Sequence, residues 1–239
     1  MQVGYTHANW FYTGRVIKNV KSYDFTSSYP YVMLSEKYPS SKFDKINIKS
    51  LNELMKSFCY IIKIKFYNIQ SKYLNDILSM SKCLDIKGGI FDNGRVQKAD
   101  FVEFVGTEVD IKLFCEFYKF SKYEILESYY SNKSYLPEKF YNFILNKYVE
   151  KTKLKGVQDR EIEYALAKNQ FNSLYRLGMS VTNNIRDEVI FDGINWNEEK
   201  LSNFDIQMKL LDEKEKGFLN FAWRNICNSL CKAKFIRKC

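Results

Sequence analysis

The chain has 239 residues, of which 46% are hydrophobic and 17% aromatic, and it contains only three prolines and ten glycines. This composition excludes an intrinsically disordered protein, and no Pro/Gly/Ser-rich stretch marks a long flexible linker. The 37 lysines and arginines exceed the 28 aspartates and glutamates, so the net charge of +9 favours a polyanionic partner such as nucleic acid or an acidic membrane, with a solvated lysine-rich surface as the alternative.

The first predicted element is an extended segment, Arg15–Phe25, in which Asp24 and Phe25 belong to the sequence Y-D-F-T-S-S-Y-P. Pro30 then opens a short helix, because a proline at the first helical position gives up no helical hydrogen bond. Asp24 is therefore expected where a strand gives way to a helix. Further strand-like segments are Cys59–Phe66, Ile90–Val96, Phe101–Val105, Tyr123–Tyr129 and Val189–Phe191. The Asn93-Gly94 pair predicts a hairpin turn within the second of these segments.

Two helices are predicted in the middle of the chain. Thr107 can cap the first, which runs to about Lys119, and capping also explains the E-x-D pair Glu108 and Asp110. Pro137 opens the second, whose apolar residues recur every three or four positions and therefore form one apolar face. These apolar residues are Phe140, Phe143, Ile144 and Tyr148.

A basic connector leads into a third helix, predicted from about Asp159 to Leu177, and a short loop between two helices favours an antiparallel pair. Lys168, Asn172 and Tyr175 lie at i, i+4 and i+7 on this helix, so all three can contact one ligand. A surface helix with a polar face is the alternative. An apolar stripe beside them consists of Ala167, Phe171 and Leu174. A last helix is predicted from about Phe218 to Lys232.

These elements could together support phosphoryl transfer. That chemistry needs a carboxylate to hold a divalent metal, main-chain N–H groups to bind a triphosphate, and cations to neutralise the leaving pyrophosphate. Asp24 could supply the carboxylate, and the amides from Phe25 to Tyr29 lead into a helix N-terminus, which favours anions. Lys151 in the connector and Lys168 could supply the cations.

Other site classes find less support in the sequence. The only histidine is His7, which excludes catalysis by a histidine pair. The six cysteines are expected to be reduced, and the final C-x3-C-x7-C spacing matches no common zinc pattern. No apolar run of about 18 residues and no leader-like start occur, so a cytoplasmic protein is expected. The basic tail does not line a long amphipathic helix, which argues against a membrane-surface protein.

Two motifs carry a family resemblance. Y-D-F-T-S-S-Y-P resembles the first polymerase motif of family B DNA polymerases, D-x-x-S-L-Y-P, and K-N-Q-F-N-S-L-Y resembles the second, K-x-x-x-N-S-x-Y-G. The long insertion between them and the segment N-K-Y-V-E-K-T are similar to the protein-primed branch found in phages and linear plasmids. V-G-Y-T-H-A-N resembles the segment that joins exonuclease and polymerase regions, with Val3 in place of a glycine.

The resemblance implies magnesium in a two-metal site, with Asp24 as the catalytic ligand and the backbone carbonyl of Phe25 as a further one. It places Ser27 and Ser28 against the triphosphate, and Tyr29 under the sugar, where it would reject ribonucleotides. Lys151 and Lys168 would bind phosphates. The pocket for the nascent base pair would include Asn172 and Tyr175, and the DNA-binding residues would be Tyr5, His7 and Ser173.

The same resemblance implies an α+β fold with an antiparallel palm sheet, two-helix fingers and an inserted small α+β subdomain. The expected division is 1–40 for the palm with the first motif, 41–135 for the insertion, 136–180 for the fingers and 181–239 for the palm continuation. The implied reaction is template-directed DNA synthesis from deoxynucleoside triphosphates in a bacterial host cytoplasm. Its partners would be template and primer DNA and a terminal protein primer.

The sequence departs from the family pattern in three places. Arg176 stands where the second motif has glycine. No Asp-Thr-Asp third motif occurs after Leu177; the aspartates there, in polar surroundings, are Asp187, Asp192, Asp205 and Asp212. The end after F-L-N-F-A-W resembles a truncated or frame-shifted family segment, and neither an exonuclease motif nor a thumb is evident. We therefore expect this chain alone to be inactive or severely impaired. Two hypotheses remain: a second chain supplies the missing aspartate, or the chain is a non-catalytic remnant that binds DNA or nucleotide.

Overall fold

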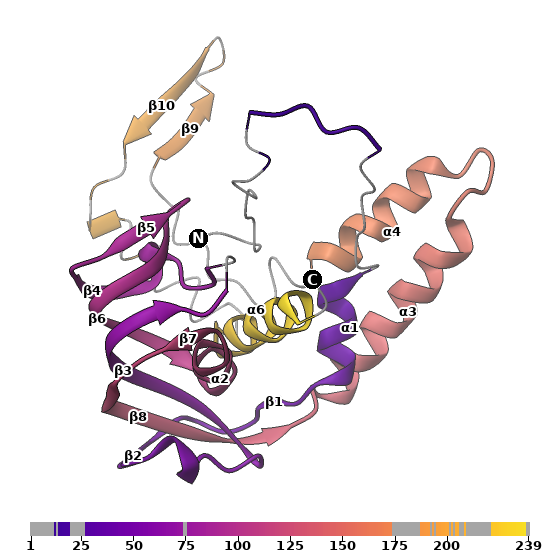
Figure 1. Cartoon of the computed structure of the whole chain (residues 1–239). Helices are drawn as coiled ribbons and strands as arrows, with labels where there is room; N and C mark the ends of the chain where they lie inside the picture. The colour runs from indigo at the N-terminus through magenta and orange to yellow at the C-terminus, as the bar shows by residue number, and fades with distance from the viewer. Residues whose placement is uncertain are drawn as a thin grey trace. The chain divides into compact units, whose positions relative to one another are not determined.

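Figure 1 shows the computed structural model of the protein. It describes residues 12, 14–19, 27–73, 76–173, 187–191, 193, 195–200, 202, 204–205, 208 and 221–237, with 171–173, 187–191, 196–200, 221 and 224 described by their backbone alone. The chain divides into two compact units, one formed by residues 1–142 and 225–239 and the other by residues 143–224.

An eight-stranded antiparallel sheet forms the centre of the first unit, and its main order is β1-β8-β3-β6-β4. Strands β2, β5 and β7 pair with β8, β6 and β3, respectively. The strands are β1 (Tyr38–Pro39), β2 (Asp44–Ile46), β3 (Phe58–Ser71), β4 (Cys83–Lys87), β5 (Ile90–Asp92), β6 (Arg95–Thr107), β7 (Tyr118–Lys119) and β8 (Lys122–Ser134). Short 3-10 turns, η2 (Leu51–Glu53) and η3 (Met80–Lys82), precede β3 and β4.

Strand β3 lies between the two other long strands, β6 and β8. Its sequence explains this position, because Ile62, Ile64 and Phe66 alternate with more polar residues and are completely buried. On the opposite face of β3, Lys63 forms an ion pair with Glu103 of β6 at 3.1 Å. The alternation therefore fixes the register, since a shift by one residue would bury the lysines.

The predicted hairpin turn joins β5 to β6. Asp92 pairs with Arg95, and the two residues between them have positive φ angles, 47° for Asn93 and 71° for Gly94. Two consecutive positive φ angles are typical of the type I′ turn, which Asn-Gly favours. The hairpin prediction is confirmed.

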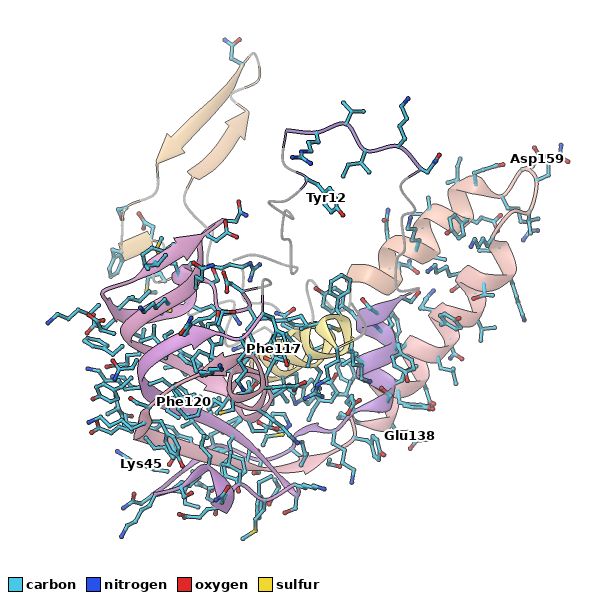
Figure 2. All side chains as sticks on the ribbon, viewed as in Figure 1. Tyr12, Lys45, Phe117, Phe120, Glu138 and Asp159 are labelled. Atoms are coloured by element: carbon cyan, nitrogen blue, oxygen red, sulfur yellow. The ribbon has the colours of Figure 1, made fainter. Side chains whose placement is uncertain are left out.

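Two helices, α2 (Glu108–Phe117) and α6 (Phe221–Ile236), contribute to the core beside the sheet, and Figure 1 shows them on the same side of it. Phe114 of α2 lies with its ring centroid 4.4 Å from that of Phe66 and 4.5 Å from that of Tyr118. Figure 2 shows Phe117 at the end of α2. From α6, Ala233 and Ile236 join the same buried cluster. This aromatic core joins the sheet to both helices.

The predicted cap of α2 is confirmed. Thr107 Oγ1 accepts a hydrogen bond from the Asp110 backbone N–H at 3.2 Å, and Asp110 Oδ2 accepts one from the Thr107 backbone N–H at 3.3 Å. This reciprocal pair is a capping box. Glu108 has a different role, because it accepts a hydrogen bond from the Tyr60 N–H and forms an ion pair with Lys133 at 2.9 Å.

Several boundaries differ from the predictions. Helix α1 (Ser28–Ser35) begins two residues before Pro30, which occupies the third helical position instead of the first. Residues 15–19 form no strand, and the rest of the predicted extended segment lies outside the described residues. Helix α6 continues to Ile236, beyond the predicted end at Lys232.

Helix α3 (Glu138–Leu154) leads from the first unit into the second, and α4 (Glu161–Ser173) follows after a short loop. Figure 1 shows that the two helices run in opposite directions. The apolar residues of α3 differ in burial, because Ile144 is 1% exposed while Phe143 and Tyr148 are 41% and 40% exposed. Strand β9 (Asp187–Phe191) pairs with β10 (Trp196–Lys200), which the sequence did not predict. The predicted α+β class with an antiparallel sheet is confirmed.

Candidate nucleotide site at the start of helix α1

The start of α1 contains three of the predicted triphosphate and sugar contacts. Ser27 precedes the helix in the left-handed region, with φ 53° and ψ 46°, and its carbonyl accepts a hydrogen bond from the Tyr31 N–H at 3.0 Å. Ser28 and Tyr29 follow in the first turn and are partly exposed, whereas Pro30 is buried. A helix N-terminus carries partial positive charge, so this turn can bind an anion.

Two thiols of α6 contact the first turn of α1. Cys231 Sγ donates to the Ser28 carbonyl oxygen at 3.7 Å, and Cys227 Sγ lies 4.0 Å from the Tyr29 carbonyl oxygen. Beside them is Tyr38 of β1, a residue with only 1% exposure, and burial raises the pKa of its hydroxyl well above the usual value, with the neighbouring Cys227 adding to the effect. Both thiols therefore contact backbone carbonyl oxygens in the first turn of α1.

Lys234, on the same face of α6, joins the other end of α1. Its Nζ forms an ion pair with Glu36 at 2.6 Å and donates to Ser35 Oγ at 3.4 Å. It also lies 4.7 Å from the ring centroid of Tyr31. Sequence reasoning did not identify α6 as the support of α1. The available signal was the spacing of Cys227, Cys231 and Lys234 at i, i+4 and i+7, which places them on one face.

Another face of α6 is held by a buried polar cluster. Lys232 Nζ donates to the Ile77 carbonyl oxygen at 2.7 Å, and Arg95 Nη1 donates to the same oxygen at 3.3 Å. Ser229 Oγ donates to Asp110 Oδ2 at 2.7 Å. Burial lowers the pKa of Lys232 to about 8, against a smaller opposing effect of Asp110. A lysine with this pKa at neutral pH is still mostly charged, so burial here is costly.

At the end of α6, Arg237 binds Glu116 of α2 through Nε at 3.2 Å and Nη2 at 2.9 Å. The basic tail of the sequence consists of Lys232, Lys234, Arg237 and Lys238, and the structure describes the first three. All three are therefore engaged in contacts within the fold.

The predicted phosphate-binding lysines belong to the second unit. Lys151 is half-buried in the last turn of α3, and Lys168 is exposed on α4. The backbone of Asn172 and Ser173 lies in the final turn of α4, so the helical spacing of Lys168 and Asn172 is present. Ala167, from the apolar stripe of this helix, is 3% exposed.

The remaining predicted site residues lie outside the described residues: Asp24, Phe25, Tyr5, His7 and Tyr175. Among the residues that the structure describes, no group of three or more histidine, cysteine or acidic side chains is placed to hold a metal ion. Because Asp24 is not among them, the predicted magnesium site stays a prediction. None of the described helices is both long and apolar enough to cross a membrane.

The sheet, the helices packed on it and the antiparallel helix pair define a polymerase-like α+β fold. It resembles solved structures of Phi29 DNA polymerase. The complex with primer-template DNA matches with a TM-score of 0.60 and 16% identity, over 90% of this chain and 33% of that chain. The ternary complex with primer-template DNA and incoming nucleotide matches with a TM-score of 0.55 and 17% identity, over 90% of this chain and 34% of that chain.

The complex of the same polymerase with single-stranded DNA has a TM-score of 0.57 and 15% identity to this chain, again over 90% of this chain and 34% of that chain. The chain thus spans about a third of the length of that polymerase. No family model matches the sequence, and no curated protein matches it. At this identity the likeness describes the fold.

Proposed function

We propose that the chain binds DNA and a deoxynucleoside triphosphate as the palm-and-fingers portion of a DNA-directed DNA polymerase. The observation that carries this proposal is the agreement of motif order with fold. The sequence Y-D-F-T-S-S-Y-P leads into helix α1, and K-N-Q-F-N-S-L-Y begins on helix α4, within a chain whose fold resembles a DNA polymerase over 90% of its length.

In this proposal the triphosphate binds at the start of α1. Ser27 and Ser28 contact its oxygens, while Tyr29 lies against the sugar. Two features of the described residues support an anion there: the helix N-terminus favours negative charge, and two thiols of α6 contact the carbonyl oxygens of the turn, which leaves its N–H side for a ligand. Lys151 and Lys168 neutralise phosphate charge, and Asn172 and Tyr175 line the base-pair pocket.

The finer parts of the proposal follow from the sequence resemblance. Magnesium is held by Asp24 and the Phe25 carbonyl, and it stabilises charge on the reacting phosphate. The enzyme is of the protein-primed type, with a terminal protein as primer and template DNA near Tyr5, His7 and Ser173. A second chain supplies the missing catalytic aspartate.

The first test measures binding of a fluorescent deoxynucleoside triphosphate to the full chain with magnesium, by anisotropy. Removing one charged hydrogen-bond donor from a bound phosphate typically costs about 1.5–3 kcal/mol, so Lys168→Ala should weaken binding by about 10- to 100-fold. Lys112→Ala, another exposed helical lysine, is the matched control. Asp24→Asn should weaken magnesium-dependent binding, whereas Asp85→Asn on exposed β4 should not.

The second test is primer extension by the same chain. Extension that needs Asp24 would identify a complete polymerase. Another outcome is nucleotide binding without extension of the primer. If adding a chain that carries an Asp-Thr-Asp motif then restores extension, the partner-chain hypothesis is supported. If no added chain restores extension, a non-catalytic module that binds DNA or nucleotide is supported. Nucleotide binding that is absent, or unchanged in both Lys168→Ala and Asp24→Asn, would overturn the proposal.

A further inference from the structure

The thiols of Cys227 and Cys231 form a pair beneath the first turn of α1. They are four residues apart on α6, so their Cβ atoms are expected to be about 5–6 Å apart on one face. Their sulfurs reach the carbonyl oxygens of two consecutive residues, Tyr29 at 4.0 Å and Ser28 at 3.7 Å. The neighbouring Cys231 thiol and burial raise the pKa of Cys227 well above its usual value. Both thiols therefore lie against the same helical turn.

This geometry favours a bridging atom over a disulfide. A disulfide needs Cβ atoms about 3.5–4.5 Å apart, which is closer than helical residues at i and i+4 come without distortion of the helix. Two bonds of about 2.3 Å from thiolates to one soft atom hold the sulfurs roughly 3.5–4 Å apart, which is within the range of a thiol–thiol hydrogen bond. Both sulfurs can thus bond to one thiophilic atom without distortion of helix α6.

The surroundings also suit a neutral soft ligand. Cys227 is completely buried, the buried Tyr38 ring lies beside it, and Cys231 is partly exposed. Burial keeps the Cys227 thiol protonated, so reagents that need a thiolate should react with it slowly. Cys231 provides the first point of attachment, and the second bond then forms within the protein at a high effective concentration.

The other described cysteines offer no such pair. Cys59, Cys83 and Cys115 lie on β3, β4 and α2, which are three separate elements. Each is at least partly buried, and burial raises the pKa of each. We propose that Cys227 and Cys231 form a two-thiol site that binds trivalent arsenicals and similar thiophilic ligands with two exchangeable positions.

With phenylarsine oxide the reaction balances without an oxidant. Two As–S bonds form, the As–O bonds break, and the oxygen leaves as water with the two thiol protons, while arsenic stays trivalent. The bridged atom would lie against the carbonyls of Ser28 and Tyr29. If the proposed function holds, and this consequence rests on it, the occupied site should displace the first turn of α1 and weaken binding of the triphosphate.

The test is a titration of the reduced full chain with phenylarsine oxide, followed by native mass spectrometry and thiol counting. One equivalent should bind and lower by two the number of free thiols counted after unfolding, and a small dithiol should reverse the binding. Cys227→Ser and Cys231→Ser should each lower the affinity by about 100-fold or more, because only one bond remains. Cys83→Ser and Cys115→Ser, on β4 and α2, should leave it unchanged. Circular dichroism checks that the variants fold, and Cys231→Ala provides a second replacement.

Tight binding that persists in folded Cys231→Ser or Cys231→Ala would overturn the site, as would a wild-type chain that binds no arsenical. The coupling is measured separately, as triphosphate affinity with the arsenical site full. A weakening of about 10-fold or more supports the coupling, and an unchanged affinity overturns it while the thiol site stands. A chain that binds the arsenical but binds no triphosphate in either state counts against the proposed function alone.

Discussion

Replacing Lys232 with methionine should change how the stability of the fold depends on pH. Burial lowers the pKa of this lysine from 10.5 to about 8, with Asp110 opposing the shift and Lys82 and Arg95 adding to it. Methionine keeps the unbranched shape but removes the charge. The Ile77 carbonyl oxygen loses the Lys232 donor and keeps the hydrogen bond from Arg95.

The sign follows from proton binding in the two states. Below about pH 8 the Lys232 amine is protonated in both the folded and unfolded chains, so the folded state carries the full cost of the buried charge. As pH rises from about 8 towards 10.5, the folded amine loses its proton first and that cost disappears. The difference between the two pKa values corresponds to about 3 kcal/mol. Subtracting about 1 kcal/mol for the lost hydrogen bond, Lys232→Met should stabilise the fold by about 2 kcal/mol at pH 7.

The assay is urea unfolding at intervals between pH 7 and 10, followed by circular dichroism. The quantity to compare is the difference in unfolding free energy between Lys232→Met and wild type at each pH, because the buried thiols affect both proteins equally. The advantage of the variant should shrink as pH rises above 8. For Lys112→Met, at an exposed position of α2, the difference in unfolding free energy from wild type should stay near zero at every pH. A difference for Lys232→Met that is flat across this pH range would refute the reasoning.

Three further predictions concern the core and the cap, each measured by urea unfolding. Phe114→Ala should cost about 3–5 kcal/mol, because the ring is 1% exposed and packs against two others; a cost as small as that of Phe91→Ala, at an exposed position, would contradict this. Thr107→Ala should cost about 1–2 kcal/mol by removing the capping box of α2, and an unchanged unfolding free energy would exclude that role. Burial raises the pKa of Cys59 to about 12, so the unfolded chain ionises first and wild type should lose stability as pH rises above 9. Cys59→Val should lose less stability over the same pH range. If the unfolding free energies of this variant and of wild type fell equally with pH, the role assigned to Cys59 would be wrong.

Features determined by neighbouring residues were predictable from the sequence. The Asn93-Gly94 turn depends on two residues that accept positive φ angles, and the cap of α2 joins Thr107 to a residue three positions away. Each interaction is complete within a few residues, so composition and spacing are sufficient to identify it.

Contacts between distant segments were not predictable in the same way. Cys227 and Tyr29 are separated by 198 positions, and Lys232 and Ile77 by 155. The period of apolar residues on α3 indicates a face, but it does not say what covers that face. This is why the spacing alone does not distinguish Ile144, which is 1% exposed, from Phe143, which is 41% exposed.

In the candidate site, too, local features were predictable and contacts between distant segments were not. Ser28 and Tyr29 begin a helix close to where the motif predicts one, since a helix start is a local property. The roles of Asp24 and Tyr175 stay predictions, because these residues lie outside the described part of the chain. The support of the site by α6 is a tertiary property that emerged only from the structure.

The contact between α1 and α6 has a consequence for synthesis of the protein on the ribosome. The hydrogen bond from Cys231 to Ser28 spans 203 positions. Translation at about 5–20 residues per second therefore leaves α1 without these thiols for roughly 10–40 s after it has been made. During that interval the sheet can form from its own strands, but the turn that begins α1 cannot reach its final geometry. Maturation of the candidate site should thus be a late event that is timed by the appearance of α6.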